Sequence, residues 1–388
     1  MEFVKPGTYI DFMRHRGPVV GASLFLVAAS LVSLFAPGPN YGIDFAGGTE
    51  IQLKFEGDVS SDELRTTLGE LGYRSADVVS VEGADNEFMV RVGEVSALPD
   101  EQREQLETGI TEFVTEDVLR EIRISPGGDK ITLRLTQDVD LAALKGVIEQ
   151  QGIVVRGEPS PLAGSEDTRI EIFLEGVADE LVAQLQDRLG DRAPSDPERI
   201  EWVGPKAGAQ LRDAAVKSLL YAIAFIMVYV AFRFDLRFAP GGVLAMFHDA
   251  VITLGIYVLV QKEVNLTTVA ALLTILGYSI NDTIVVYDRI RENMGRYRDK
   301  SLRELINLST SQMLSRTIVT SGTTLLSVLA FFIWGTPVIK DISFALFCGI
   351  LIGTYSSIYV AAPVTEYMDR RFFSKPKATG KRRAAARA

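Results

Sequence analysis

The most prominent pattern along the chain is a series of apolar blocks separated by polar stretches. A membrane-spanning helix needs about 20 largely apolar residues, and six windows meet this requirement: 18–36, 213–232, 239–260, 266–287, 316–335 and 342–362. The first window resembles a signal peptide, but Leu34 occupies the position where a small residue would precede cleavage after Ala36. Because five further spans follow, the first is expected to remain as an anchor.

Between the first two windows, apolar and polar residues alternate as in half-buried strands. Segment 47–55 matches segment 127–135 at an offset of 80 residues, each beginning Gly-Gly and continuing with strict alternation. Each is followed by a turn and a helical pattern, at 61–71 and 140–151, and then by a glycine suited to end a helix. Chance similarity is the alternative, but nine aligned positions with further landmarks favour duplication.

The repeat predicts two ferredoxin-like β-α-β-β units, each a small sheet covered by helices on one face. The first unit is expected over 37–122 and the second over 123–212. Further strands are expected at 78–81, 88–92, 153–156 and 169–174, and a helix after each unit at 100–120 and 177–190. The predicted fold class is therefore a polytopic α-helical membrane protein with six transmembrane helices and an exported α+β domain between helices 1 and 2.

Charge divides the chain in the same way as hydropathy. The 388 residues carry a formal net charge of −10, yet residues 37–210 hold 36 acidic and 16 basic side chains, and the remainder is net positive. The acidic region contains no histidine and no cysteine, since Cys348 lies in an apolar block, so neither a disulfide nor a thiol-bound metal is expected there. These features predict a binding or lever module rather than an enzyme, with no cofactor, no metal and no nucleic-acid partner.

Basic residues predict the orientation, because cytoplasmic segments are enriched in lysine and arginine. Twenty basic residues fall in the N-terminal segment 1–17, the 233–238 turn, the loop 288–315 with Arg316 at its end, and the tail 363–388. The two short loops on the other side hold only Lys262 and Lys340. We therefore expect an inner-membrane protein with both termini cytoplasmic and residues 37–212 in the periplasm.

Ionisable residues inside the spans are functional candidates, because a charge at membrane depth costs at least a few kcal/mol. Asp282 lies about 24 Å into the fourth span, given a rise of about 1.5 Å per residue. Thr274 and Tyr278 share its helical stripe and are expected to face the bundle interior with it. Asn281 and Thr283 flank the carboxylate.

Two other positions carry charge in the spans. Arg316 opens the fifth span, followed by Thr320 one turn later, and lies in the same half of the membrane as Asp282, so an ion pair between them is geometrically possible. Snorkelling of Arg316 to the surface is the alternative. His248 and Asp249 fall near the middle of the third span, where they either bind protons or join helices by hydrogen bonds.

Span six carries a stripe of small residues, Gly349, Gly353 and Ser357, which lets another helix approach closely. This helix belongs either to the same bundle or to a partner subunit.

Several motifs together resemble the SecF family of Sec translocase membrane subunits, a branch of the SecD/SecF family in the resistance–nodulation–division superfamily. The resemblance covers all six spans and the start of the exported domain, including the His248-Asp249 pair. It rests on segments 277–283, 286–293, 315–317, 320–324 and 353–359, and on a G-x-D-F-x-G-G signature formed by Gly42, Asp44, Phe45, Gly47 and Gly48.

The resemblance implies a subunit that works with SecD, and often a small accessory subunit such as YajC, beside the SecYEG channel. It implies that the proton-motive force drives late steps in the export of unfolded polypeptides. On this analogy Asp282 is the proton-responsive carboxylate and Arg316 its modulating neighbour. The usual SecF exported domain holds one α+β unit, whereas two are predicted here.

Two other functions remain open. Half of a small-molecule or lipid exporter of the same superfamily would lack a SecD-like partner, whereas a membrane-anchored receptor would leave Asp282 unexplained.

Overall fold

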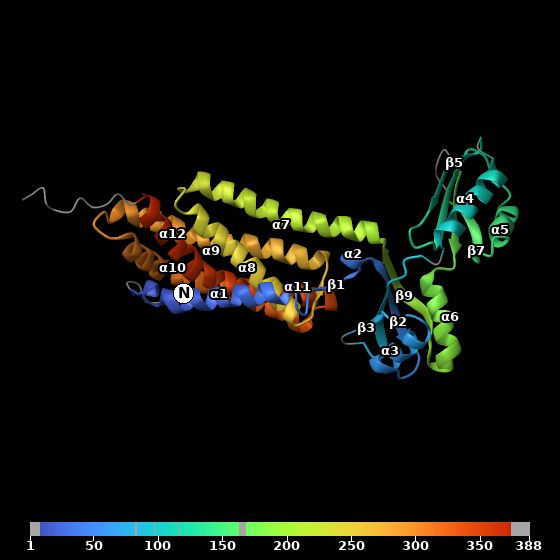
Figure 1. Cartoon of the computed structure of the whole chain (residues 1–388), viewed down its shortest axis with the longest axis horizontal. Helices are drawn as coiled ribbons and strands as arrows, with labels where there is room; N and C mark the ends of the chain where they lie inside the picture. The colour runs from blue at the N-terminus through green and yellow to red at the C-terminus, as the bar shows by residue number, and fades with distance from the viewer. Residues whose placement is uncertain (1–7, 82–83, 97, 116, 163–167, 374–388) are drawn as a thin grey trace, which may run out of the picture. The chain divides into compact units, whose positions relative to one another are not determined.

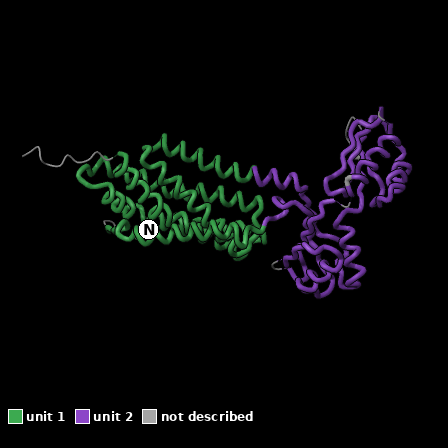
Figure 2. The backbone as a smooth tube through the Cα atoms, in the orientation of Figure 1, with its two compact units in different colours: residues 1–40, 214–388 green, residues 41–213 purple. Residues whose placement is uncertain are grey.

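The computed structural model describes residues 8–81, 84–96, 98–115, 117–162 and 168–373, and forms two compact units (Figure 2). One unit contains residues 1–40 and 214–388, and the other contains residues 41–213. Lys5 and the basic tail from residue 374 lie outside the described residues.

Within the described residues, six helical stretches are long and apolar enough to cross a membrane, which confirms the predicted number. The first stretch is the short helix η1 (Phe12–His15) followed directly by α1 (Arg16–Ser33). The next four are single helices: α7 (Pro205–Arg233), α8 (Ala239–Leu259), α9 (Leu266–Arg296) and α10 (Leu302–Trp334). The sixth consists of α11 (Pro337–Ser356), a π-helical turn η3 (Ser357–Ala361), α12 (Ala362–Met368) and η4 (Asp369–Phe373). A two-residue strand, β10 (Glu263–Val264), precedes α9.

Helices α9 and α10 continue well into the segment expected to be a loop at 288–315. Ion pairs one turn apart, such as Arg289 with Glu292 and Arg291 with Asp288, support the polar end of α9. Ser301 begins α10 with a capping box, since its hydroxyl accepts from the backbone N–H of Glu304. Only residues 297–301 separate the two helices, so the difference arises because polar side chains extend a helix beyond the apolar window.

The 41–213 unit contains two four-stranded sheets (Figure 1). The first sheet has the order β3-β4-β2-β9, formed by β3 (Asp77–Ser80), β4 (Glu87–Val92), β2 (Gly48–Phe55) and β9 (Pro194–Val203), with every pair antiparallel. Alternate residues of β2 are buried, among them Ile51 and Leu53, as the sequence pattern predicts. Helices α3 (Ser61–Glu70) and α6 (Val177–Leu189) share the core of this sheet.

The second sheet has the order β5-β6-β8-β7 and is also antiparallel throughout. It is formed by β5 (Leu119–Ile124), β6 (Lys130–Leu135), β8 (Thr168–Leu174) and β7 (Val155–Leu162). Its core includes residues of α4 (Asp100–Val114) and α5 (Leu141–Glu149). The remaining short elements are β1 (Asn40–Tyr41), α2 (Ile43–Ala46) and η2 (Gly190–Arg192).

The two sheets divide the 41–213 unit differently from the expected boundary at residue 122. Helix α6 lies in the first core through Leu181 and Leu185, whereas α4 lies in the second through Leu106 and Ile110. The second α+β unit, which runs from α4 to β8, is therefore inserted between β4 and α6 of the first α+β unit. Without this insertion, the first α+β unit has the order β-α-β-β-α-β along the chain. The pattern of an amphipathic helix does not specify which of two sheets it covers, so sequence periodicity could not assign these helices.

Gly47 and Gly48, at the start of β2, have backbone dihedral angles that residues with a side chain rarely adopt. Gly47 has φ +78° and a Cβ there would lie 3.0 Å from Cα of Pro205, while Gly48 has φ +120° and a Cβ would lie 2.5 Å from the carbonyl oxygen of Val92. Both glycines are thus required for the backbone of β2 to approach its neighbours closely.

We expect Gly48→Val to destabilise the 41–213 unit by about 2–4 kcal/mol, because it adds a strained φ and a backbone clash. The measurement is the denaturant midpoint of Trp202 fluorescence in the full chain with Trp334→Phe, which removes the other tryptophan. Gly93→Val is the matched control, because a Cβ at Gly93 meets nothing within 4 Å. Equal midpoints for the two variants would show that β2 and β4 do not pack as described.

Candidate functional site

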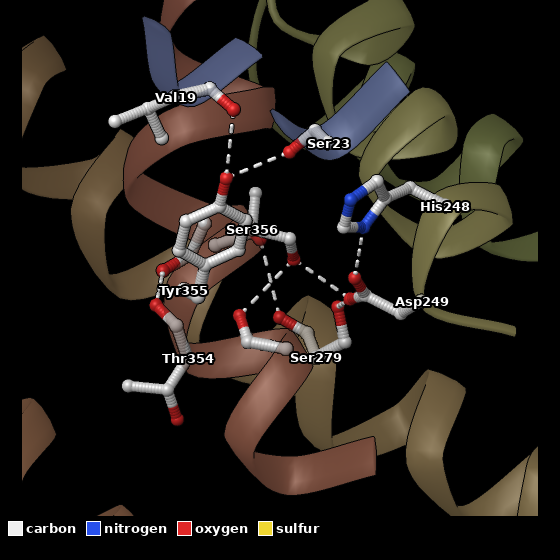
Figure 3. A network of polar contacts seen from close by, with 11 residues as sticks. Val19, Ser23, His248, Asp249, Ser279, Thr354, Tyr355 and Ser356 are labelled. Carbon is white, nitrogen blue, oxygen red and sulfur yellow. Dashed lines mark hydrogen bonds and ion pairs between the residues drawn. The ribbon is translucent and has the colours of Figure 1, made fainter. Parts of the chain in front are cut away.

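Asp249 lies at the centre of a polar network inside the helical bundle (Figure 3). Its carboxylate is fully buried and contacts groups from three helices. Ser279 of α9 donates to Oδ2 at 2.5 Å, Ser356 of α11 donates to the same oxygen at 2.7 Å, and Nδ1 of His248 lies 2.8 Å from Oδ1. The network therefore joins α8, α9 and α11 at one carboxylate.

His248 is buried beside Asp249, with only 5% of its surface exposed. Its ring stacks on Tyr355 with the centroids 6.2 Å apart. Tyr355 reaches α1, where its hydroxyl donates to the carbonyl oxygen of Val19 at 3.0 Å and lies 2.7 Å from Oγ of Ser23. The second ring nitrogen, Nε2 of His248, is buried and has no hydrogen-bond partner in the described part of the chain. A buried polar atom without a partner is costly and calls for an explanation.

Asp282 forms a second network one turn further along α9. Ser321 of α10 donates to Oδ2 of Asp282 at 3.1 Å, and Thr354 of α11 donates to Oγ of Ser321 at 3.0 Å. Asp282 is buried as well. Thr354 and Ser356 lie two residues apart, so α11 contributes a hydroxyl to each network, and α9 contributes Ser279 to one and Asp282 to the other.

Arg316 is exposed in this chain. Within the part of the chain that the structure describes, no ion pair joins Arg316 to Asp282. Its guanidinium still lies near enough to act on the Asp282 carboxylate electrostatically through space. Thr320 is exposed and donates to the carbonyl oxygen of Arg316 at 2.9 Å, which is a contact within its own helix. The structure thus places Arg316 beside the Asp282 network rather than within it.

The expectation that Thr274 and Tyr278 accompany Asp282 toward the bundle interior is wrong. Tyr278 is 44% exposed, and Thr274 is exposed and donates to the carbonyl of Ala270 in its own helix. Asn281 is exposed too, whereas Thr283 is buried and donates to the carbonyl oxygen of Ser279 at 3.1 Å. Because a stripe three or four residues apart covers a wide arc, its edges can face outward even when its centre is buried.

The small-residue stripe of α11 packs inside this bundle, which resolves the alternative left open by the sequence. A Cβ added to Gly349 would clash with the side chain of Ile275, and one added to Gly353 would lie 3.2 Å from Cβ of Ser279. Ser357 is buried. The stripe therefore brings α11 against α9, which lets Ser356 and Ser279 reach the same carboxylate oxygen.

The arrangement places both buried carboxylates where a bound proton would change their charge. Two carboxylic acids are buried among hydroxyl groups, and a proton is the smallest species that can neutralise them there. Among the described residues, no group of three or more histidine, cysteine, aspartate or glutamate side chains could hold a metal ion.

The 41–213 unit contains a cavity of about 400 Å³, lined by residues of both α+β units. Ile200 and Trp202 line it from β9, and Arg156 and Gly157 line it from β7. In the sheet orders, β9 and β7 are both edge strands. Phe173 of β8 adds a half-exposed aromatic ring. An edge strand carries unpaired backbone N–H and C=O groups, so the cavity offers both main-chain and apolar contacts.

Comparisons with known proteins agree on one family. The model described as protein export membrane protein SecD/SecF, C-terminal, matches residues 188–371, and the SecD/SecF GG motif model matches residues 32–59. The protein translocase subunit SecF of Magnetococcus marinus is 36% identical over 95% of this chain and 95% of its own length, and that of Vibrio alginolyticus is 34% identical over 93% and 90%.

Among solved structures, SecDF, a translocon-associated membrane protein from Thermus thermophilus, is 34% identical with a TM-score of 0.63. The match covers 94% of this chain but 39% of the SecDF chain, so this chain spans well under half the length of that protein.

Proposed function

The chain is a multi-pass membrane protein that belongs to the SecF family of protein translocase subunits, and we propose that it drives late steps of polypeptide export with the proton-motive force, together with a SecD-type subunit beside the SecYEG channel. The observation that carries this proposal is Asp282, a carboxylate buried in the spans and linked by hydroxyl groups to α10 and α11.

Exposed polar groups on the bundle support a partner within the membrane. Tyr278, Asn281 and Thr274 of α9 and Thr320 of α10 are exposed in this chain although they lie in the spans. Polar groups facing lipid are unfavourable, so contact with another membrane subunit would cover them. The match to 39% of the SecDF chain fits the same idea, with the remaining SecD-like part supplied by a separate chain. A small accessory subunit such as YajC belongs to the same proposal.

The proposed location is the inner membrane, with both termini in the cytoplasm and residues 37–212 in the periplasm. Basic residues that the structure describes support this orientation: Arg233 ends α7, Arg237 lies between α7 and α8, and Arg289, Arg291 and Arg296 lie in the last two turns of α9. The role proposed for the chain is not enzymatic.

The proposed coupling uses a change of charge at Asp282. An ionised carboxylate attracts hydroxyl donors and the nearby guanidinium of Arg316, whereas a neutral one releases them. Because Ser321 links Asp282 to Thr354, protonation would alter contacts between α9, α10 and α11 together. Helix packing has discrete arrangements, so such a local change can be transmitted to larger movements of attached domains.

The cavity of the exported region is proposed to hold the emerging polypeptide. An extended chain can pair with an edge strand through main-chain hydrogen bonds, which depend little on sequence. A translocase must handle many sequences, and the edge strands β9 and β7 with Trp202 and Phe173 nearby suit this need.

We expect an unfolded polypeptide that lacks tryptophan to change the fluorescence of Trp202. The chain has two tryptophans, Trp202 and Trp334, so the Trp334→Phe variant reports on the cavity alone. A saturable change is expected in this variant and none in the Trp202→Phe control. A change seen only with Trp334 present would place polypeptide binding outside the cavity.

Affinity purification in mild detergent tests the function as a whole. A SecD-type protein and components of the SecY channel are expected to copurify with the chain. A homodimer without either partner would instead favour the alternative, half of a small-molecule or lipid exporter of the same superfamily.

A further inference from the structure

We propose that His248 and Asp249 form a second proton-binding site in the membrane-spanning bundle, separate from Asp282 and linked to it through α9 and α11. This inference rests on the proposed proton-coupled function and adds a second carrier of charge to it. Its basis is the buried imidazole–carboxylate contact of 2.8 Å, together with the buried Nε2 that has no partner in the described structure.

The pair holds one exchangeable proton. With a protonated imidazole and an ionised carboxylate, the pair has no net charge. Moving the proton from His248 onto Asp249 leaves this net charge unchanged. Loss of the proton leaves a net charge of −1 at a carboxylate that is fully buried. The hydroxyl groups of Ser279 and Ser356 both donate to this carboxylate, which makes the charged form attainable.

Among the residues that the structure describes, no further ion pair compensates the charge of Asp249. Among the described contacts, Tyr355 on α11 is the titratable group that stacks on the His248 ring, and α1 contacts Tyr355 through the hydroxyl of Ser23 and the carbonyl of Val19. Asp282 lies further along α9, with its own bond to Ser321. In the described part of the chain, the ion pair of Asp249 is with His248. The negative charge of Asp249 is therefore balanced when the imidazole of His248 is protonated on both ring nitrogens. Because Nδ1 faces Asp249, Nε2 is the atom that accepts the second proton.

The two acidic sites are connected by short stretches of helix. Ser279 and Asp282 lie three residues apart on α9, and Thr354 and Ser356 lie two residues apart on α11, so each helix contacts both networks. The π-helical turn η3 begins at Ser357, directly after Ser356. Such turns are frequent at functional sites and allow local changes of helical register. Proton binding at one carboxylate would thus shift α9 and α11, and this shift would change the hydrogen bonds of the other carboxylate.

The test uses the fact that the chain contains two histidines, His15 and His248. The full chain with its SecD-type partner is labelled with ¹⁵N-histidine in the His15→Gln background and placed in lipid nanodiscs. The ring nitrogen shifts of His248 are followed between roughly pH 5 and pH 9, the range in which imidazole charge commonly changes. We expect one reversible titration.

Two variants make the result specific. Asp249→Asn is expected to weaken proton binding by the imidazole at least tenfold, because it removes the facing negative charge. Asp282→Asn is expected to shift the same titration by a smaller amount. The proton-binding site is refuted if the His248 ring keeps one protonation state across the pH range, or if its titration is the same in Asp249→Asn. The proposed coupling between the two carboxylates is refuted if the titration is the same in Asp282→Asn.

His15 provides the matched control in the His248→Gln background, since it is exposed and lies outside the network. Its ring nitrogen shifts are expected to be the same with and without Asp249→Asn, because His15 makes no contact with that carboxylate in the described part of the chain. The titration requires no export activity. If it occurs while Asp282→Asn exports normally, the proposed function fails and the proton site stands, so the two failures are distinguishable.

Discussion

Replacing Asp282 with asparagine is expected to abolish the stimulation of export by a proton gradient while the protein still folds and inserts. Asparagine preserves the shape of the side chain and can still accept a hydrogen bond from Ser321, which lies 3.1 Å from the carboxylate. It cannot gain or lose a proton, so the charge no longer changes. The gradient-dependent fraction of export should therefore fall to zero, leaving the rate that wild type shows without a gradient.

The measurement is translocation of a labelled polypeptide into membrane vesicles, with and without an uncoupler and at several pH values. Asp299→Asn serves as the matched control, because Asp299 is exposed between α9 and α10, outside the spans. This control should retain both the stimulation and its pH response. Normal export with a normal pH response in Asp282→Asn would refute the role given to this carboxylate.

The first sheet shows what sequence patterns could and could not predict. The alternating segments that became β2, β4, β6 and β8 were identified within a few residues because their buried and exposed positions follow a period of two. Strand β9 was missed. It begins at Pro194, contains Pro197 and several charged residues, and pairs with β2 from far along the chain. Proline is tolerated at an edge strand, which is the position of β9, so the pairing partner and not the local pattern decides this element.

The candidate site was predictable only in its charged members. Asp249 and Asp282 stand out because carboxylates are rare in apolar spans. The hydroxyl groups that bind them, from Ser279, Ser321 and Ser356, carry no such signal, since serine in a helix commonly bonds to its own backbone. Their role depends on which helices pack together, and that information is tertiary. The misplacement of Tyr278 has the same cause.

Close packing of α11 on α9 at Gly353 is the feature that brings two serines to one carboxylate. A Cβ at Gly353 would lie 3.2 Å from Cβ of Ser279, 3.3 Å from its Cα and 3.5 Å from Oδ2 of Asp249. A larger side chain there must separate the helices. Separation would remove the hydrogen bonds that Ser279 and Ser356 donate to Asp249, because the two serines lie on different helices.

We therefore expect Gly353→Leu to lower the thermal midpoint of the purified chain in detergent by about 5 °C or more. Overpacking costs about 1–3 kcal/mol, and the loss of hydrogen bonds to a buried charged group adds about 1.5–3 kcal/mol for each bond. A change of about 1 kcal/mol shifts the midpoint by about 2–4 °C in a domain of about 150–250 residues, the size range of the bundle unit. Gly277→Leu on α9 is the matched control, because a Cβ there meets nothing within 4 Å. Equal midpoints in the two variants would mean that α9 and α11 are not in contact at Gly353, and the carboxylate of Asp249 would then need other partners to remain buried.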